Sequence, residues 1–250
     1  IQLPGMKLAF DMGCCPRSAV SRPTVLFTHA HVDHMSAVIS HCATRSLMGM
    51  APPTYVVPPA ILEDFNALFD VWRRLDGSDL PCTVVPVGPG EQFESNKRHI
   101  IRPARSIHRV ESQGYTIYEK RSRLRSDLKG QSRQAIREAR ERGEDVSESS
   151  EVPLVSFTGD TRIEMLEQQP DFQRSRLLIM EVTFFDDRVT VPQARNKGHI
   201  HFDEVIARHG LFQNEAILLT HTSQRYKRQE VLGILDDKLP PQLRAKISLL

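Results

Sequence analysis

The stretch FTHAHVDHMS, which starts at Phe27, places three histidines and one aspartate within six positions. It continues from Pro23–Thr28, an apolar run with the character of a buried strand. A cluster of potential ligands at such a point requires a fold that fixes strand ends rigidly and leaves them open on one side. We therefore expect this segment to connect a buried strand to a helix.

The four polar side chains divide into two pairs. On extended backbone His29 and His31 point to the same side, whereas the first helical turn directs Asp33 and His34 elsewhere. One loop then offers ligands to two neighbouring positions, and imidazole with carboxylate suits Zn²⁺, with Mn²⁺ or iron as alternatives. The competing interpretation is a helix capped by Asp33 beside incidental surface histidines.

Short apolar runs alternate with helical periodicity along the rest of the chain. Strands are predicted at Lys7–Asp11, Pro23–Thr28, Thr54–Val57, Cys82–Val87, His99–Arg102, Tyr115–Tyr118, Val155–Phe157, Leu177–Met180, Ala216–Thr220 and Lys246–Leu250. Helices are predicted at Met35–Met48, Ala60–Leu75, Asp203–Arg208 and Gln224–Leu235. This interleaving favours a layered α/β fold. We expect a single domain over residues 1–250, and because the chain starts at Ile1 inside a strand-like segment, we expect its first strands to be missing.

The composition limits the classes of partner. The formal net charge is only +2, so a surface for nucleic acid must come from local clustering of charge. The four cysteines form no CxxC pair, which argues against a zinc ribbon or a disulfide framework and favours an intracellular setting. We expect the cytoplasm or nucleus ahead of an organelle. No apolar run reaches membrane-spanning length, so no membrane partner is expected.

One segment differs in character from its surroundings. Lys120–Gly143 carries nine Lys and Arg against three Asp and Glu, and an acidic, Ser-rich stretch follows it to Glu151. We expect a charged inserted arm at about residues 120–151, outside the core. The alternative is a solvated helix with i,i+4 ion pairs such as Arg137–Glu141.

Three segments farther along the chain place further ligands after predicted strands. They are SIHRVESQGY with His108, VSFTGDTR with Asp160 and AILLTHTSQRY with His221. Together with the HxHxDH pattern of the first segment, this ordered set resembles the metallo-β-lactamase superfamily. The resemblance implies a four-layer αββα sandwich with a metal site at the sheet edge and two Zn²⁺ per subunit.

The superfamily pattern divides the ligands between two metals. It assigns to the first metal His29, His31 and His108. It assigns to the second Asp33, His34 and His221, with Asp160 as the bridge. Asp11 in LAFDMG matches the aspartate of the superfamily's first motif, which implies a role in orienting the ligand loop. A turn residue before Gly13 is the alternative for Asp11.

Several motifs are similar to the short form of the tRNase Z (ribonuclease Z) family. They are HRVESQGY, GDTR, LTHTSQRY and MEVTFFDD followed by GHIHFDEV. The resemblance implies a zinc-dependent endoribonuclease that removes the 3′ trailer from precursor tRNA. Glu181 matches the glutamate of the family's HEAT motif and His199 the histidine of its HST motif. The chain departs from these motifs at Met180 and Ile200.

The residues suit phosphodiester hydrolysis. Two metals lower the pKa of a water molecule and clamp phosphate oxygens. Asp33 is expected to accept the remaining proton of the water, and His199, kept protonated by Glu181, to act as general acid. An ordinary surface ion pair is the alternative for Glu181 and His199. His201 is predicted either to support the site from behind the ligands or to cap the helix at Asp203.

In this family an arm between the third and fourth motifs grips the substrate, often from the partner subunit of a dimer. The resemblance therefore implies a homodimer and points to the charged segment as the arm. The predicted phosphate-binding residues are Arg121, Arg123, Arg125, Arg133 and Arg137.

Two other functions compete with this prediction. A hydrolase with the same metals could act on a small phosphodiester or a thioester, which would need no basic arm. A non-catalytic RNA-binding protein with degenerate metal sites is the other alternative.

Overall fold

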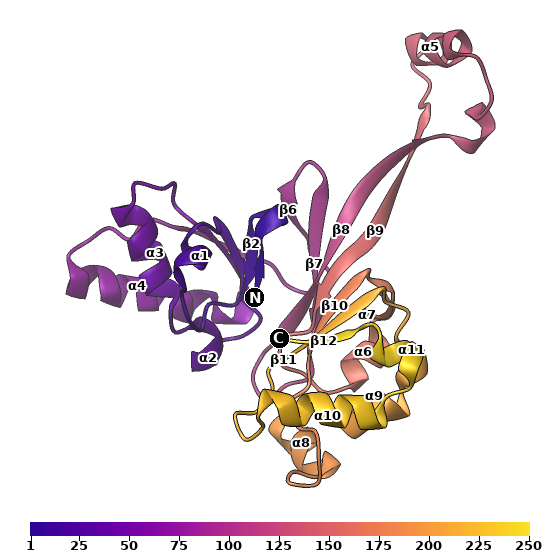
Figure 1. Cartoon of the computed structure of the whole chain (residues 1–250). Coiled ribbons are helices and arrows are strands. Elements are labelled where there is room, and N and C mark those ends of the chain that lie inside the picture. Colours follow the sequence, from indigo (N-terminus) through magenta and orange to yellow (C-terminus); the bar gives the residue numbers. More distant parts are fainter.

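Two β-sheets face each other in the computed structural model, which describes all 250 residues (Figure 1). The first sheet has the order β1 (Gln2–Leu3), β2 (Leu8–Phe10), β3 (Thr24–Leu26), β4 (Thr54–Val57) and β5 (Thr83–Pro86). The second has the order β12 (Ile247–Leu249), β11 (Ala216–Thr220), β10 (Leu177–Glu181), β9 (Ser147–Phe157), β8 (Gln113–Leu124), β7 (His99–Arg105) and β6 (Phe93–Asn96). Strands β2 to β5 run parallel, as do β9 to β12, whereas β6 to β9 are antiparallel.

Helices cover the outer face of each sheet. The first sheet carries α1 (Arg17–Val20), α2 (Val32–Met35), α3 (Val38–Leu47) and α4 (Leu62–Asp76). The second carries α6 (Glu164–Gln168), α7 (Pro170–Arg174), α8 (Val191–Lys197), α9 (Phe202–Ala207), α10 (Arg228–Lys238) and α11 (Pro241–Arg244). None of these helices has both the length and the apolar character needed to cross a bilayer. The predicted four-layer αββα sandwich is confirmed.

Three hydrophobic clusters fill the three spaces between the four layers. Alternation along each strand explains them, because successive side chains point to opposite faces of a sheet. Val25 packs under the helices of the first sheet, and its neighbour Leu26 packs between the sheets. Leu178 and Ile179 divide in the same way on the second sheet. Strands buried on both faces are apolar throughout, which is why they were visible in the sequence.

The helix predicted at Met35–Met48 is wrong at its start. The chain forms α2 and α3 as separate helices, because the backbone between them bonds to Met12. The Met12 amide donates to the carbonyl of His34 at 2.6 Å, and the Ala37 amide donates to the carbonyl of Met12 at 2.9 Å. Because of this interruption, α2 is a separate short helix, and it carries Asp33 and His34.

Strands β8 and β9 leave the sheet as a two-stranded ribbon that carries α5 (Arg133–Glu141) at its tip (Figure 1). The strands predicted there were too short, because the outer parts of β8 and β9 are polar and give no hydrophobic signal. At about 3.4 Å per residue, β8 extends over about 37 Å. Ala139 and Val146 are buried at the tip, but they belong to none of the three hydrophobic clusters.

Acid is expected to destabilise the protein through His41 on α3. The ring is fully buried, with Nδ1 2.9 Å from the Tyr55 hydroxyl and Nε2 3.1 Å from the Arg22 carbonyl. Burial and then the charge of Arg45 lower the pKa of His41 from 6.5 to about 4. The unfolded chain therefore takes up this proton first, so the stabilisation is present above pH 6.5 and is lost as the pH falls toward 4.

We expect His41 to account for about 2 kcal/mol of lost unfolding free energy between pH 7 and pH 5. Urea denaturation of the wild type and of His41→Gln at both pH values, with chelator in every sample, measures this contribution. The variant should show the shallower pH dependence. Equal slopes in the two proteins would exclude this role for His41.

Candidate metal and catalytic site

The candidate site lies where strand ends from both sheets meet. Residues that follow parallel strands gather at one edge of a sheet, the usual position of ligand sites in α/β folds. Asp11 follows β2, His29 follows β3, Asp160 follows β9 and His221 follows β11. The loop between β7 and β8 adds His108. The predicted ligands from distant parts of the chain are thereby brought together.

The first group of ligand atoms comes from His29, His31, His108 and Asp160. All of these atoms lie within 4.8 Å of one another. Nε2 of His108 is 3.4 Å from Nδ1 of His31, and Nε2 of His29 is 3.8 Å from Oδ2 of Asp160. Four donors at this spacing form a site of the size that a transition-metal ion needs.

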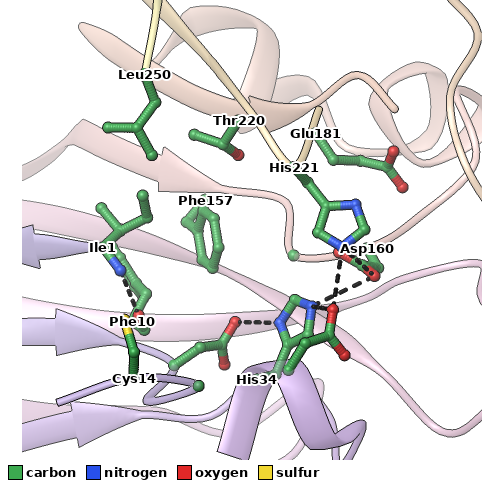
Figure 2. A pocket seen from close by; sticks show the side chains of 14 residues that line it. Ile1, Phe10, Cys14, His34, Phe157, Asp160, Glu181, Thr220, His221 and Leu250 are labelled. Carbon is green, nitrogen blue, oxygen red and sulfur yellow. Dashed lines mark hydrogen bonds and ion pairs between the residues drawn. The ribbon is translucent and has the colours of Figure 1, made fainter. Parts of the chain in front are cut away.

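The second group contains Asp33, His34 and His221. Oδ2 of Asp33 is 3.6 Å from Nε2 of His34 and 3.5 Å from Nε2 of His221. Oδ2 of Asp160 is 3.4 Å and 3.3 Å from the same two nitrogens (Figure 2). One oxygen of Asp160 therefore faces both groups, which is the position that a bridging ligand would take.

The hydrogen bonds of the histidines fit a metal site. The Nδ1–H of His34 donates to Asp11 at 2.8 Å, that of His108 to the Gly198 carbonyl at 2.9 Å, and that of His221 to Thr183 Oγ1 at 3.0 Å. These tautomers follow from the hydrogen-bond network. In each case Nε2 is turned toward the ligand groups, which is how metal-binding histidines are usually held.

His29 provides the sharpest test of this fit. Its Nδ1 lies 2.9 Å from Thr28 Oγ1, whose own hydrogen goes to Asp11, so Nε2 carries the lone pair. That Nε2 is buried and has no hydrogen-bond partner. Burial and the neighbouring His34 lower the pKa of His29 to about 2, so the ring is neutral near pH 7. A buried acceptor without a partner is costly, and a metal ion would satisfy it.

Two ligand-side residues have a strained backbone. Asp11 and His221 adopt left-handed φ values of 54° and 59°, which non-glycine residues rarely do. Such strain is concentrated at functional sites, where the surrounding structure fixes it. Gly198 has φ 82°, and a Cβ added there would lie 2.6 Å from Nδ1 of His108. This position must therefore be glycine for the carbonyl to accept from His108.

Glu181 and His199 form a buried pair beside the cluster. Glu181 is only 1% exposed, and its Oε1 lies 3.0 Å from Nδ1 of His199. Burial lowers the pKa of His199, but the hydrogen bond to Glu181 and the charges of Glu181 and Asp160 outweigh it, so the net pKa is raised. The alternative of an ordinary surface ion pair is wrong, because Glu181 is inside the protein.

Sequence reasoning missed three residues that support these groups. Thr28 connects His29 to Asp11, Gly198 accepts from His108, and Thr183 accepts from His221 while donating to Glu181 at 2.7 Å. A signal was present for Thr183, which is the threonine retained in the matched HEAT motif. Gly198 acts through its backbone carbonyl and Thr28 through the side chains of His29 and Asp11. The spacing of residues in the sequence does not show contacts of these kinds.

An open cavity of about 390 Å³ borders the cluster (Figure 2). Its polar wall contains Asp11, Asp33, His34, Asp160, Glu181 and His221. Its apolar wall includes Phe10 and Phe157. Ligand groups that open to a cavity are accessible to a substrate.

Known proteins share this chain's sequence over nearly its whole length. A tRNase Z of Arabidopsis thaliana is 36% identical over 249 residues, which cover 99% of this chain and 89% of the relative. The chain belongs to the tRNase Z family. The chloroplastic tRNase Z of the same plant is 32% identical over 247 residues, covering 98% of this chain and 70% of that protein. No family model matches the chain.

Solved structures place the chain in the same fold. The human short-form tRNase Z superposes with a TM-score of 0.60 at 16% identity, covering 96% of this chain and 84% of that chain. The metallo-β-lactamase fold protein YhfI of Bacillus subtilis gives 0.61 at 15% identity, covering 96% and 83%. The predicted family, fold and enzyme class are confirmed.

His201 of this chain lies apart from the ligands. It caps α9, where its Nδ1 accepts from the Asp203 amide at 3.1 Å, and its Nε2 lies 3.2 Å from the Asp186 carbonyl. Neither bond goes to a member of the cluster. Of the two roles predicted for His201, the helix cap describes its contacts.

The five arginines predicted to bind substrate fall into two sets. Three are paired with carboxylates of the same ribbon: Arg121 with Glu119 at 2.6 Å, Arg125 with Asp127 at 2.9 Å and Arg137 with Glu141 at 2.9 Å. The other two, Arg123 and Arg133, are exposed and make no ion pair. Unpaired cations are the better phosphate ligands, because binding requires no carboxylate to be displaced.

Proposed function

We propose that the chain is a divalent-metal-dependent endoribonuclease that removes the 3′ trailer from precursor tRNA. The observation that carries this proposal is the buried Glu181–His199 pair at 3.0 Å, directly beside the histidine and aspartate cluster. Similarity over nearly the whole chain to proteins named tRNase Z supports the substrate. A hydrolase for small esters would need the ligands but not this second pair.

Two Zn²⁺ per subunit are the proposed cofactors, with Mn²⁺ as the alternative. The residues that would hold the first are His29, His31 and His108. The residues that would hold the second are Asp33, His34 and His221, with Asp160 shared. When bound, such ions stabilise charge on phosphate oxygens and lower the pKa of water. Asp11 would orient His34, to which it is bonded at 2.8 Å.

The protein's own groups would manage the protons. Asp33 is 68% exposed at its side chain and can accept a proton from the attacking water. As water adds to phosphorus, the bond from phosphorus to the ribose 3′ oxygen breaks. His199 has Nδ1 committed to Glu181, so its Nε2–H is free to donate to that oxygen. The products would be tRNA with a 3′-hydroxyl and a trailer with a 5′-phosphate.

The ribbon arm is proposed to bind the body of the substrate. Its tip with α5 lies at the opposite end of the molecule from α2 and α8, which flank the site (Figure 1). Arg123 and Arg133 therefore cannot touch the scissile phosphate of their own subunit, but they can bind a distant part of a folded tRNA or one held by a partner subunit. We propose a homodimer, for which α4 offers an exposed apolar face with Val71, Trp72 and Leu75.

An intracellular location is part of this proposal, since precursor tRNA occurs inside cells. The similar proteins carry names that refer to the chloroplast and, for a Triticum aestivum ribonuclease Z, to the nucleus. Either compartment would supply the substrate.

The decisive test is cleavage of a precursor tRNA that carries a 3′ trailer, followed by mapping of both new ends. We expect one cut after the mature domain, a 3′-hydroxyl on the tRNA and a loss of activity with chelator that zinc restores. Hydrolysis of bis(p-nitrophenyl) phosphate without cleavage of precursor tRNA would favour the small phosphodiester function instead. Binding of tRNA without hydrolysis of either substrate would favour the non-catalytic alternative.

Shortening the arm is expected to weaken precursor tRNA binding. Leu124 and Ser147 are paired across the ribbon, so an Asn-Gly turn can join them in place of residues 125–146. Loss of several phosphate contacts should raise KM for precursor tRNA roughly 10- to 100-fold and flatten its salt dependence. Turnover of bis(p-nitrophenyl) phosphate should remain, because the change lies beyond the outer end of β8, a strand that extends over about 37 Å.

Point variants identify the residues responsible. Arg123→Ala and Arg133→Ala remove the two unpaired cations of the predicted set, and Arg137→Ala removes a paired one as the matched control. Arg133→Ala should show part of the effect of shortening, which keeps Arg123, and adding Arg123→Ala should raise KM further. A shortened enzyme that keeps the wild-type KM would remove the arm from substrate binding.

A further inference from the structure

A separate cavity, of about 380 Å³, is lined by Arg188, Val189, Gln193, Asn196, Lys197 and Arg225. Three of these residues are cations, and no carboxylate lines the cavity. The cavity is therefore suited to an anion.

The charges in this cavity differ in how far they are neutralised. Arg188 is paired with Asp186 at 2.8 Å and with Glu230 at 2.5 Å, and it stacks over Tyr226 at 4.3 Å. Lys197 makes no ion pair and is exposed, and the side-chain amide of Asn196 makes no hydrogen bond within the protein. Lys197 and Asn196 are thus free to bind a ligand.

A further free cation, Arg109, belongs to the loop between β7 and β8 and does not line the cavity. Arg109 is exposed and makes no ion pair. Its amide nitrogen would be 3.3 Å from a Cβ added to Gly198, so Arg109 adjoins the segment that Lys197 begins. The carbonyl of Gly198 accepts from His108, so Lys197 and Arg109 lie on the two chain segments that meet at this ligand.

The cavity is built from the same segments as the catalytic site. Lys197 ends α8 two residues before His199, and the loop after β11 supplies both His221 and the cavity wall. The rings of His199 and His221 stack with centroids 5.2 Å apart. A polymer that extends from the site along the end of α8 would reach this cavity.

The direction of the substrate follows from the role proposed for His199. His199 is to protonate the ribose 3′ oxygen, so the nucleotide that carries this oxygen must lie on the His199 side. That nucleotide belongs to the mature tRNA, and the next phosphate toward the 5′ end lies beyond its ribose. The trailer leaves on the opposite side, away from α8.

We propose that this cavity binds the phosphate immediately 5′ of the scissile one, on the mature side of the substrate, through Lys197 and Asn196, with Arg109 on the adjoining loop as a second cation outside the cavity lining. The proposal rests on the proposed function. Lysine and amide donors bind phosphate oxygens without reading the base, so the subsite would hold any tRNA in register. It would act on the binding of RNA, not on the bond that breaks.

Kinetics of Lys197→Ala on precursor tRNA test this subsite. We expect KM to rise five- to tenfold, kcat to change less than twofold and the salt slope of kcat/KM to become shallower by about 0.7 to 0.9. Any loss on bis(p-nitrophenyl) phosphate, which has no neighbouring phosphate, should be at least fivefold smaller than the loss on precursor tRNA. Arg74→Ala removes one exposed, unpaired charge on α4 and is the matched control.

Chemically modified substrates test which phosphate Lys197 contacts. A methylphosphonate removes the charge of one phosphate, and we place it either just 5′ of the scissile phosphate or just 3′ of it. On the 5′-modified RNA the wild type and Lys197→Ala should have equal KM, whereas on the 3′-modified RNA they should still differ five- to tenfold. Lys197→Arg should keep KM within twofold on unmodified substrate.

Three outcomes would overturn the proposal. One is a Lys197→Ala enzyme that matches Arg74→Ala on precursor tRNA, and another is equal KM on the 3′-modified RNA instead of the 5′-modified one. The third is a wild type that hydrolyses bis(p-nitrophenyl) phosphate but leaves precursor tRNA intact. The third removes the proposed function as well, whereas the first two leave it standing.

Discussion

Asp160→Ala is expected to lower kcat/KM for precursor tRNA by on the order of 10⁴-fold, about 5 kcal/mol of transition-state stabilisation. Oδ2 of Asp160 lies 3.3 Å from Nε2 of His221, 3.4 Å from that of His34 and 3.8 Å from that of His29. No other carboxylate oxygen faces both ligand groups at these distances. Its loss should reduce bound zinc from two ions to fewer than one per chain, as measured by elemental analysis of dialysed protein.

A surface aspartate provides a control for the Asp160→Ala variant. Asp187 is exposed and makes no ion pair, so Asp187→Ala removes the same charge without touching the cluster. That protein should keep its zinc and its activity. Thermal unfolding in the presence of chelator separates loss of metal from loss of fold, because the two proteins should then unfold at similar temperatures. Two zinc ions and full activity in Asp160→Ala would refute the shared-ligand role.

His199→Ala is expected to lower kcat on precursor tRNA by roughly 10²- to 10⁴-fold while zinc content stays at the wild-type value. The ring donates a proton in the proposed reaction but is not assigned to either metal. The leaving ribose oxygen is strongly basic and needs that proton. The p-nitrophenolate ion is a weak base and leaves without one, so turnover of bis(p-nitrophenyl) phosphate should fall less than tenfold.

Two comparisons make the His199 result specific. Glu181→Gln keeps the shape of the pair but removes the charge that holds the proton on His199, so it should show the same dependence on leaving group. His209 is exposed in the turn that follows α9, and His209→Ala is the matched histidine control. An equal loss on both substrates in His199→Ala would show that His199 holds the site together and does not serve as an acid.

Much of the site was predictable because ligands and strand ends coincide. Apolar strands such as Ala216–Thr220 are buried on both faces and are visible as continuous runs, so the residue that follows each run is located closely. His221, Asp160 and His29 were all found in this way. Their meeting in space could not be derived from spacing, since it depends on how two sheets stack. The resemblance to a known superfamily supplied that step.

Other features carried no local signal. The ribbon of β8 and β9 is held by backbone pairing between polar residues, which look like a solvated segment in the sequence. The break between α2 and α3 depends on a bond to Met12, more than twenty positions away. Ion pairs within the arm, such as Arg125 with Asp127, became visible only with side chains in place.

The two departures from the family motifs have a structural explanation. Met180 and Ile200 replace polar residues of the matched motifs, and both are fully buried in the cluster between the second sheet and its helices. Glu181 and His199, one position away from each, face the site. The apolar replacements therefore strengthen the packing behind the pair and leave its hydrogen bond intact.

The ligands reach the site from both halves of the molecule. His29, His31, Asp33 and His34 belong to the first sheet and its helices, whereas His108, Asp160 and His221 belong to the second. Metal ions bound there would cross-link the two sheets, and their binding energy would add to the stability of the native state. Removal of the metal would then weaken the contact between the two sheets before it affected the hydrophobic clusters under the outer helices, so that structure and activity would be lost together.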